Sequence, residues 1–236
     1  MRVRLWAAAI VAAGMTAGAG AVTLTVSATA NPWLAGMPAG STAFDLDVAP
    51  ANSPAPVVGL PLNFGNVLRF SATGLTDHCD EGGRCGLAGP EGDPNEDTAY
   101  HWAGAENGMA NVLAPVDSLI GVFLDAAQPS LSPAPGFLDF STLVSRDFAS
   151  LSPLLKQPFF VGDGFQNDGT TVQSFFIPSG ATRLFLGTMD GFGWYNNTGS
   201  LTVTVTEAPA PVPEPATVTL AALGLTALGL ARRRRK

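Results

Sequence analysis

Short runs of strand-forming residues, separated by turn residues, fill the middle of this chain and constrain its fold more than any other feature. Between about residues 31 and 206 no periodicity of 3.6 residues is sustained. Residues 201–206, LTVTVT, alternate strictly, with Leu201, Val203 and Val205 on one face. Such alternation is typical of a half-buried antiparallel strand. The pattern predicts an all-β domain, and we expect an antiparallel β-sandwich.

Other runs of the same kind support this assignment. Strand-like composition recurs at residues 67–72, 118–124, 170–177 and 181–188. Pro178, Ser179 and Gly180 stand between the last two runs and favour a turn, so we expect those two strands to form a hairpin. Residues 143–150 predict one short helical turn, and we find no internal repeat.

The charges are unevenly distributed along the chain. Its 236 residues carry a formal charge of −7, and 46% of them are hydrophobic, which excludes a wholly disordered protein. The acidity and the low charged fraction of 13% argue against nucleic-acid binding, which needs a basic face. Seven of the 12 basic residues lie at the two ends, namely Arg2, Arg4 and residues 232–236. The ends therefore have a different role from the middle.

The N-terminal segment has the order of a secretory signal peptide. Two arginines precede an apolar run over residues 5–15, and small residues follow. A-x-A cleavage sites occur at residues 19–21 and 28–30. We favour the second because the residue composition changes at Asn31. The expected leader is therefore 1–30 and the exported domain 31–206. An uncleaved membrane anchor is the alternative.

The C-terminal segment combines three features. A Pro-rich linker at 207–212 leads into the triplet Pro213, Glu214 and Pro215, and residues 216–231 are uncharged and rich in Leu and Ala. A helix over 216–231 would span roughly 24 Å, so we expect a single transmembrane helix in the inner membrane. The basic residues 232–236 place its end in the cytoplasm. An ordinary single-span anchor is the alternative to a sorting signal.

This tail, over residues 213–236, resembles the PEP-CTERM sorting signal in its motif, its span and its basic end. The resemblance implies recognition by an exosortase, a membrane sorting enzyme that would cleave near the triplet. The protein would be membrane-anchored before sorting and would then reach the cell surface or the extracellular matrix.

Cys79 and Cys85 are the only cysteines of the chain and lie six positions apart around two glycines. In an exported protein such a pair predicts a local disulfide. A metal site formed by both thiols, His78 and a carboxylate is the alternative.

Catalytic motifs are absent from the sequence. Neither of the two histidines lies in a nucleophile or zinc motif. The carboxylates of Asp93, Glu96, Asp97 and Glu106 are interpreted as a solvated acidic loop rather than as a glycosidase pair. We therefore expect no enzyme.

The segment 189–200, MDGFGWYNNTGS, is the strongest candidate for a binding site. Asp190, Asn196 and Asn197 offer hard oxygen ligands on a glycine-containing loop, a donor type that suits Ca²⁺. Trp194 or Tyr195 beside them would stack on the apolar face of a sugar. A plain Gly/Asn turn between two strands is the alternative.

Residues 180–205 resemble the C-terminal half of LecA-like (PA-IL-type) galactose-specific lectins. In that family an Asp begins the last loop and two adjacent Asn end it, and Asp190, Asn196 and Asn197 match these positions. Residues 89–93, GPEGD, resemble the family's GPxGD turn. The loop is one residue shorter here, and Glu96 stands where the lectins have a sugar-contacting His. The resemblance therefore implies a β-sandwich with a calcium loop more than it implies galactose as the ligand.

These observations predict an exported surface or matrix protein that binds carbohydrate, an exopolysaccharide, through a calcium loop. The alternative is a non-catalytic structural module of the envelope or matrix without a specific ligand.

Overall fold

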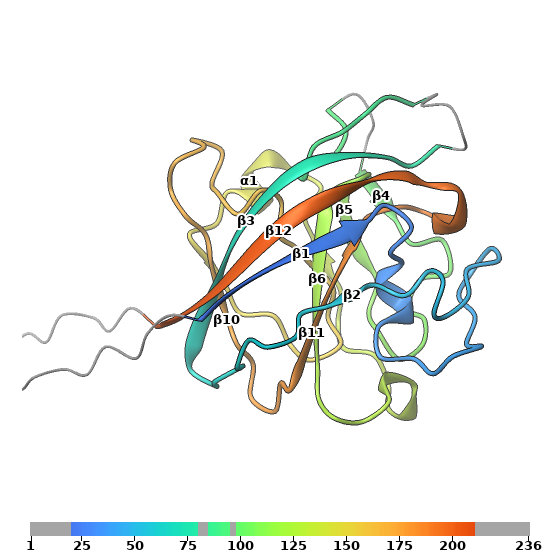
Figure 1. Ribbon diagram of the computed structural model, residues 1–236, viewed down its shortest axis with the longest axis horizontal. Helices are drawn as coiled ribbons and strands as arrows, with labels where there is room; N and C mark the ends of the chain where they lie inside the picture. The colour runs from blue at the N-terminus through green and yellow to red at the C-terminus, as the bar shows by residue number, and fades with distance from the viewer. Residues whose placement is uncertain (1–19, 80–84, 95–97, 211–236) are drawn as a thin grey trace, which may run out of the picture.

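The computed structural model describes residues 20–79, 85–94 and 98–210, and its regular structure is nearly all β-strand (Figure 1). The first sheet has the order β1 (Ala21–Ser27), β12 (Thr198–Pro209), β3 (Asn66–Asp77), β10 (Ser174–Phe176) and β8 (Ser150–Leu151). The second has the order β2 (Ala55–Pro56), β11 (Arg183–Thr188), β6 (Leu119–Leu124) and β9 (Phe159–Phe160). A small third sheet contains β4 (Thr98–Tyr100), β5 (Val112–Pro115) and β7 (Leu138–Asp139). The helical segments are α1 (Leu143–Arg146) and the 3₁₀ turns η1 (Pro32–Leu34), η2 (Pro129–Leu131) and η3 (Trp194–Asn196).

Strand β12 is the central long strand of the first sheet. It pairs antiparallel with β3 over twelve residues and with β1 over seven. Leu201, Val203 and Val205 are fully buried, so the alternation that predicted this strand is confirmed. Its threonines point away from the core, where the hydroxyls of Thr23 and Thr204 lie 2.9 Å apart across the β1–β12 pair.

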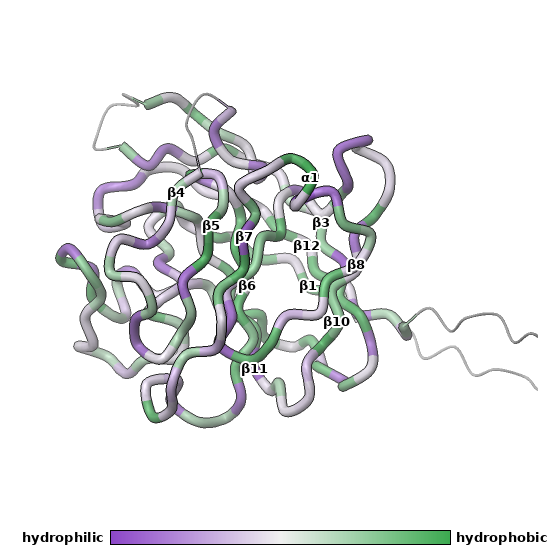
Figure 2. The backbone as a smooth tube through the Cα atoms, turned by 180° about the vertical axis from the view of Figure 1, so that it is seen from behind, coloured by the Kyte–Doolittle hydropathy of each residue, from purple (hydrophilic) through white to green (hydrophobic). Residues whose placement is uncertain are grey.

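The core lies between the first and second sheets. Phe70 and Phe175 from the first sheet meet edge to face at 5.0 Å, and Phe175 contacts Phe159 of the second sheet at 5.5 Å. Phe159 also stacks on Phe123 at 5.3 Å. The ring of Phe159 occupies the space where a Cβ at Gly121 would lie, which explains the glycine inside β6. Figure 2 shows apolar residues running along the strands that enclose this core. The two packed sheets make the all-β sandwich that the sequence predicts.

The predicted hairpin between residues 170–177 and 181–188 is wrong. β10 pairs with β3 and β8 in the first sheet, whereas β11 pairs with β6 and β2 in the second. The Pro178–Gly180 turn therefore crosses from one layer to the other. Both strands bury an apolar face, and a local turn signal cannot tell a hairpin from a crossing between layers. The short helix predicted within residues 143–150 is present as α1.

Residues 21–30 belong to the folded domain, which conflicts with the expected leader boundary at residue 30. All seven residues of β1 pair with β12, and Val26 and Ala28 are fully buried. Two side chains, those of Thr188 and Asn197, donate hydrogen bonds to the carbonyl oxygen of Ala28. The strand that begins the domain thus lies within the segment assigned to the signal peptide.

The domain also continues past residue 206. β12 ends at Pro209, and Glu207 is buried, with its carboxylate accepting hydrogen bonds from the side chains of Asn63 and Asn66, each at 2.8 Å. The sorting triplet and the predicted helix 216–231 lie outside the described residues. Among the described residues, no helix is long and apolar enough to cross a membrane.

Candidate functional site

The loop between β11 and β12 brings two predicted ligands into direct contact. Asp190 is 5% exposed, and its Oδ2 accepts a hydrogen bond from the side-chain amide of Asn197 at 3.0 Å. Its Oδ1 accepts from the backbone N–H groups of Gly191 at 2.6 Å and Phe192 at 3.4 Å. The aspartate therefore organises the start of the loop and links it to the loop's end.

Both asparagines leave a carboxamide oxygen without a hydrogen bond. Asn196 Oδ1 and Asn197 Oδ1 are buried and have no partner within the described part of the chain. A buried polar atom without a partner costs about 1–3 kcal/mol, so such atoms need an explanation. Asn197 directs its Nδ2 at Asp190 and at the carbonyl oxygen of Ala28, which leaves Oδ1 available to a cation.

Burial also disfavours the charge of the aspartate. Removal from water raises the pKa of Asp190 from 3.8 to about 6, against the opposing effects of the hydrogen bonds from Asn197 and Gly191 and of nearby His78. A bound cation would offset the cost of burying the carboxylate. One carboxylate and two amide oxygens are hard donors, and Ca²⁺ takes 6–8 oxygen ligands, so backbone carbonyls, water or sugar hydroxyls would have to complete its shell.

Two buried aspartates that sequence reasoning missed lie beside this loop. Asp77 on β3 pairs with Thr198 on β12, the residue that follows Asn197. The backbone N–H of Asp117 donates a hydrogen bond to the carbonyl oxygen of Met189, which precedes Asp190, at 2.8 Å. Both side chains are fully buried, and Asp77 Oδ2 and Asp117 Oδ1 have no partner among the described residues. They add two carboxylates next to the loop, of which Asp117 is paired with His78. The DH pair before Cys79 was the available sequence signal for Asp77.

The cysteines form the predicted disulfide rather than the alternative metal site. Cys79 and Cys85 are bonded, with Cα atoms 5.7 Å apart. Within the described residues, these cysteines and His78 are the only acid, histidine or cysteine ligands clustered in threes within 4.8 Å. Because both sulfur atoms are in the disulfide, they are not available as thiolates, and His78 Nδ1 lies 2.7 Å from Asp117 Oδ2.

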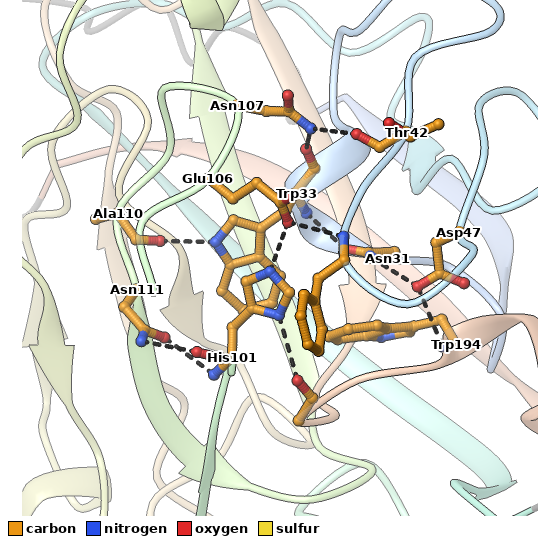
Figure 3. Close-up of polar contacts among 12 residues, drawn as sticks. Asn31, Trp33, Thr42, Asp47, His101, Glu106, Asn107, Ala110, Asn111 and Trp194 are labelled. Atoms are coloured by element: carbon orange, nitrogen blue, oxygen red, sulfur yellow. Dashed lines mark hydrogen bonds and ion pairs between the residues drawn. The ribbon is translucent and has the colours of Figure 1, made fainter. Parts of the chain in front are cut away.

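Asp47, on a loop far away in the sequence, holds the 190–197 loop from its side (Figure 3). Its carboxylate accepts from the backbone N–H groups of Trp194 at 3.2 Å and Tyr195 at 2.8 Å, and from Asn31 Nδ2 at 2.9 Å. Burial raises the pKa of Asp47 from 3.8 to about 6, although these hydrogen bonds lower it. The turn η3 is therefore anchored by a group outside its own loop.

Trp194 packs inside the domain beneath the loop backbone, so its ring is not available to a sugar. It is fully buried, lies 5.6 Å from Trp33 and 5.5 Å from His101 between ring centroids, and donates its indole N–H to the carbonyl of Thr188 at 2.9 Å. Figure 3 shows the three rings grouped together. Of the two predicted stacking residues, only Tyr195 is exposed, at 47%.

His101 and Glu106 form a second support of the loop. His101 is fully buried, stacks on Trp33 at 4.1 Å, and places Nε2 2.7 Å from a carboxylate oxygen of Glu106. Its Nδ1 lies 3.3 Å from the carbonyl oxygen of Gly191. Glu106 is therefore a structural partner of a buried ring, not a member of a solvated acidic loop. Glu96 and Asp97 lie outside the described residues.

A separate cavity of about 390 Å³ lies at the GPEGD turn and is lined by residues that include Glu91, Asp93 and Arg146. Glu91 accepts a hydrogen bond from the N–H of Asp163 at 2.8 Å, so this carboxylate holds a neighbouring turn. Burial raises its pKa. None of the residues that line this cavity belongs to the 190–197 loop, so the two sites are separate.

The chain is similar to a solved structure and to a family model. Among solved structures, one described as the EclA N-terminal domain, a PllA-like lectin, is similar over 78% of this chain and 94% of that chain, with 13% identity and a TM-score of 0.32. The search of curated proteins finds no match. Residues 211–236 match the family model of the PEP-CTERM protein-sorting motif. The end of this chain is therefore a PEP-CTERM sorting motif, which marks an exported protein that is anchored at its C-terminus before sorting.

Proposed function

We propose that this protein is an exosortase substrate whose exported β-sandwich binds Ca²⁺ in the 190–197 loop and, through it, the hydroxyls of an exopolysaccharide. One observation carries the proposal: two buried, unpartnered carboxamide oxygens lie on the loop that also contains the buried carboxylate of Asp190. A divalent cation would give oxygen atoms of this kind a partner and would balance the charge of the buried carboxylate.

The surrounding charges favour a cation at this place. Asp77 and Asp117 are buried beside the loop, and Asp45 and Asp47 also lie next to it. The basic residues outside the terminal segments are Arg69, Arg84, Arg146, Lys156 and Arg183, none of which lies on the loop. His78 opposes this effect through its contact with Asp117 and its influence on Asp190, but the carboxylates outnumber it, and their excess favours a divalent cation.

Titration calorimetry of the full-length protein with Ca²⁺ tests the proposal. We expect one site, and we expect Asp190→Asn to abolish binding because the isosteric amide keeps the shape and removes the charge. Asp168→Asn, which makes the same charge change on a different, exposed turn, is the matched control and should bind as the wild type does. Wild-type protein that binds no calcium would contradict the proposal and would favour the structural-module alternative.

Carbohydrate binding is tested separately on a glycan array with and without calcium. The proposal requires binding that disappears when calcium is chelated and that is absent in Asp190→Asn. Binding that survives chelation would mean that the sugar is recognised without the cation.

A further inference from the structure

Two large aromatic side chains stand exposed against each other next to the candidate calcium loop. Trp102 is 58% exposed and Phe192 is 41% exposed, and their ring centroids are 4.1 Å apart at an interplanar angle of 35°. Contiguous exposed apolar surface is a mark of interaction sites, and aromatic rings contribute strongly to binding at such sites. Sequence reasoning missed both, because they lie 90 positions apart.

The pair is rigidly attached to the loop. The N–H of Trp102 donates to the carbonyl of Gly191 at 2.9 Å, and a Cβ at Gly191 would lie 2.8 Å from the Trp102 indole nitrogen. The preceding residue, His101, is fixed in the buried cluster with Trp33. Because the backbone that carries the rings is held in place before a ligand arrives, less conformational entropy is lost on binding than on a free loop.

The pair is also continuous with the polar part of the site. Phe192 lies two residues after Asp190, and its N–H points at the Asp190 carboxylate at 3.4 Å. Tyr195, 47% exposed, lies at the other end of the same loop. An apolar platform therefore adjoins a group of hard oxygen donors, which matches the two-sided character of a pyranose ring, with C–H groups on a face and hydroxyls at its edge.

We propose that Trp102 and Phe192 form the stacking subsite for the apolar face of a neutral pyranose residue, placed next to the 190–197 loop. This inference rests on the proposed carbohydrate-binding function and names the chemical class of its ligand. The exposed carboxylate of Asp45, which lies beside Gly193 of the loop, disfavours uronic acids and sulfated sugars because like charges repel.

The test uses the full-length protein in a detergent without a sugar headgroup, on an array of neutral and anionic oligosaccharides in calcium. We expect neutral hexopyranose oligosaccharides to bind. Trp102→Ala and Phe192→Ala should each weaken binding by about tenfold or more, with partial recovery in Trp102→Phe. Calcium affinity should stay unchanged in the two Trp102 variants, because that side chain lies outside the 190–197 loop. Phe64→Ala, which removes an aromatic ring 73% exposed in another loop, is the matched control.

Each outcome decides between the two proposals. Full sugar affinity in Trp102→Ala, or joint loss of calcium and sugar binding, overturns the stacking subsite, as does a preference for anionic sugars. Wild-type protein that binds calcium but no glycan overturns it as well. Wild-type protein that binds neither overturns the proposed function itself.

Tryptophan fluorescence provides a second readout. Of the three tryptophans in the described residues, Trp33 and Trp194 are fully buried and Trp102 is exposed. A bound oligosaccharide from the array should protect it from iodide quenching, and Trp102→Phe should remove that change. Quenching that is unaffected by saturating sugar contradicts contact with the ring.

Discussion

Asp47 and Trp194 are joined by a hydrogen bond across 147 positions, with the Trp194 N–H donating to Asp47 Oδ2 at 3.2 Å. The same carboxylate also accepts from the N–H of Tyr195 and the side chain of Asn31. The shape of the candidate calcium loop thus depends on a residue from a loop that is distant in sequence. Ligand atoms on a loop are placed accurately only where contacts of this kind lock their positions.

Replacing Asp47 tests this dependence. Asp47→Ala leaves buried donors unsatisfied, so we expect a loss of about 2–4 kcal/mol of folding free energy and weaker calcium binding. Asp45→Asn, at an exposed neighbouring position, should change stability by less than about 0.5 kcal/mol. Denaturant unfolding measures both variants, and wild-type stability in Asp47→Ala would show that the loop is held by other contacts.

Calcium should stabilise the protein more at neutral pH than at acid pH. Folding raises the pKa of Asp190 from 3.8 to about 6. In metal-free protein the protonated carboxyl group therefore stabilises the folded state fully below pH 3.8, and this stabilisation is lost as the pH rises through about 6. Calcium needs the ionised carboxylate and restores stability over that window. The rise in Tm on adding calcium should therefore be larger at about pH 7.5 than at about pH 5.

Asp190→Asn is the control for this pH effect, because Asp47 titrates in the same range. The variant should show no calcium-dependent rise in Tm at either pH. A calcium effect that is equal at both pH values in the wild-type protein would exclude Asp190 as a ligand.

Gly191→Ala should separate the aromatic platform from the metal site. The added Cβ would come within 2.8 Å of the Trp102 indole nitrogen, and the exposed ring can move to relieve the contact. We expect a several-fold loss of sugar affinity with unchanged calcium affinity. Calorimetry with each ligand measures the two, and loss of calcium binding instead would show that Gly191 shapes the metal site.

The position of strand β1 predicts where the leader ends. Cleavage after Ala30 would remove β1 and the carbonyl of Ala28 to which Asn197 donates. We therefore expect cleavage at the earlier A-x-A site, after Ala21, which leaves Val22–Ser27 paired with β12. Mass spectrometry of the N-terminal peptide of the exported protein checks this. A stable exported protein that begins at Asn31 would mean that the first sheet is stable without β1, with β12 at its edge.

Local patterns were enough for several features. The alternation of residues 201–206 predicted β12, because a strand with one buried face shows that face in its sequence. The spacing of Cys79 and Cys85 predicted their disulfide, since so short a segment keeps the two side chains close. The hairpin between β10 and β11 was predicted wrongly, because the turn residues 178–180 do not specify which sheet each strand joins.

At the candidate site, neighbouring residues of the same type have opposite roles. Trp194 is buried beneath the loop and Tyr195 is exposed above it, although the sequence offered both as stacking residues. The 3₁₀ turn η3 and the hydrogen bonds to Asp47 decide their orientation. The pairing of Trp102 with Phe192 depends in the same way on a contact between distant segments.

The sequence alone determined the all-β class, the strand β12, the disulfide and the C-terminal sorting motif, because each is written in residues close together in the chain. Only the tertiary structure decided that β1 belongs to the domain, that β10 and β11 lie in different sheets, and which aromatic rings face the solvent. These features arise from burial and hydrogen bonds between segments far apart in sequence. The oxygen atoms of Asn196 and Asn197 become potential ligands for the same reason, since only the folded loop buries them without a partner.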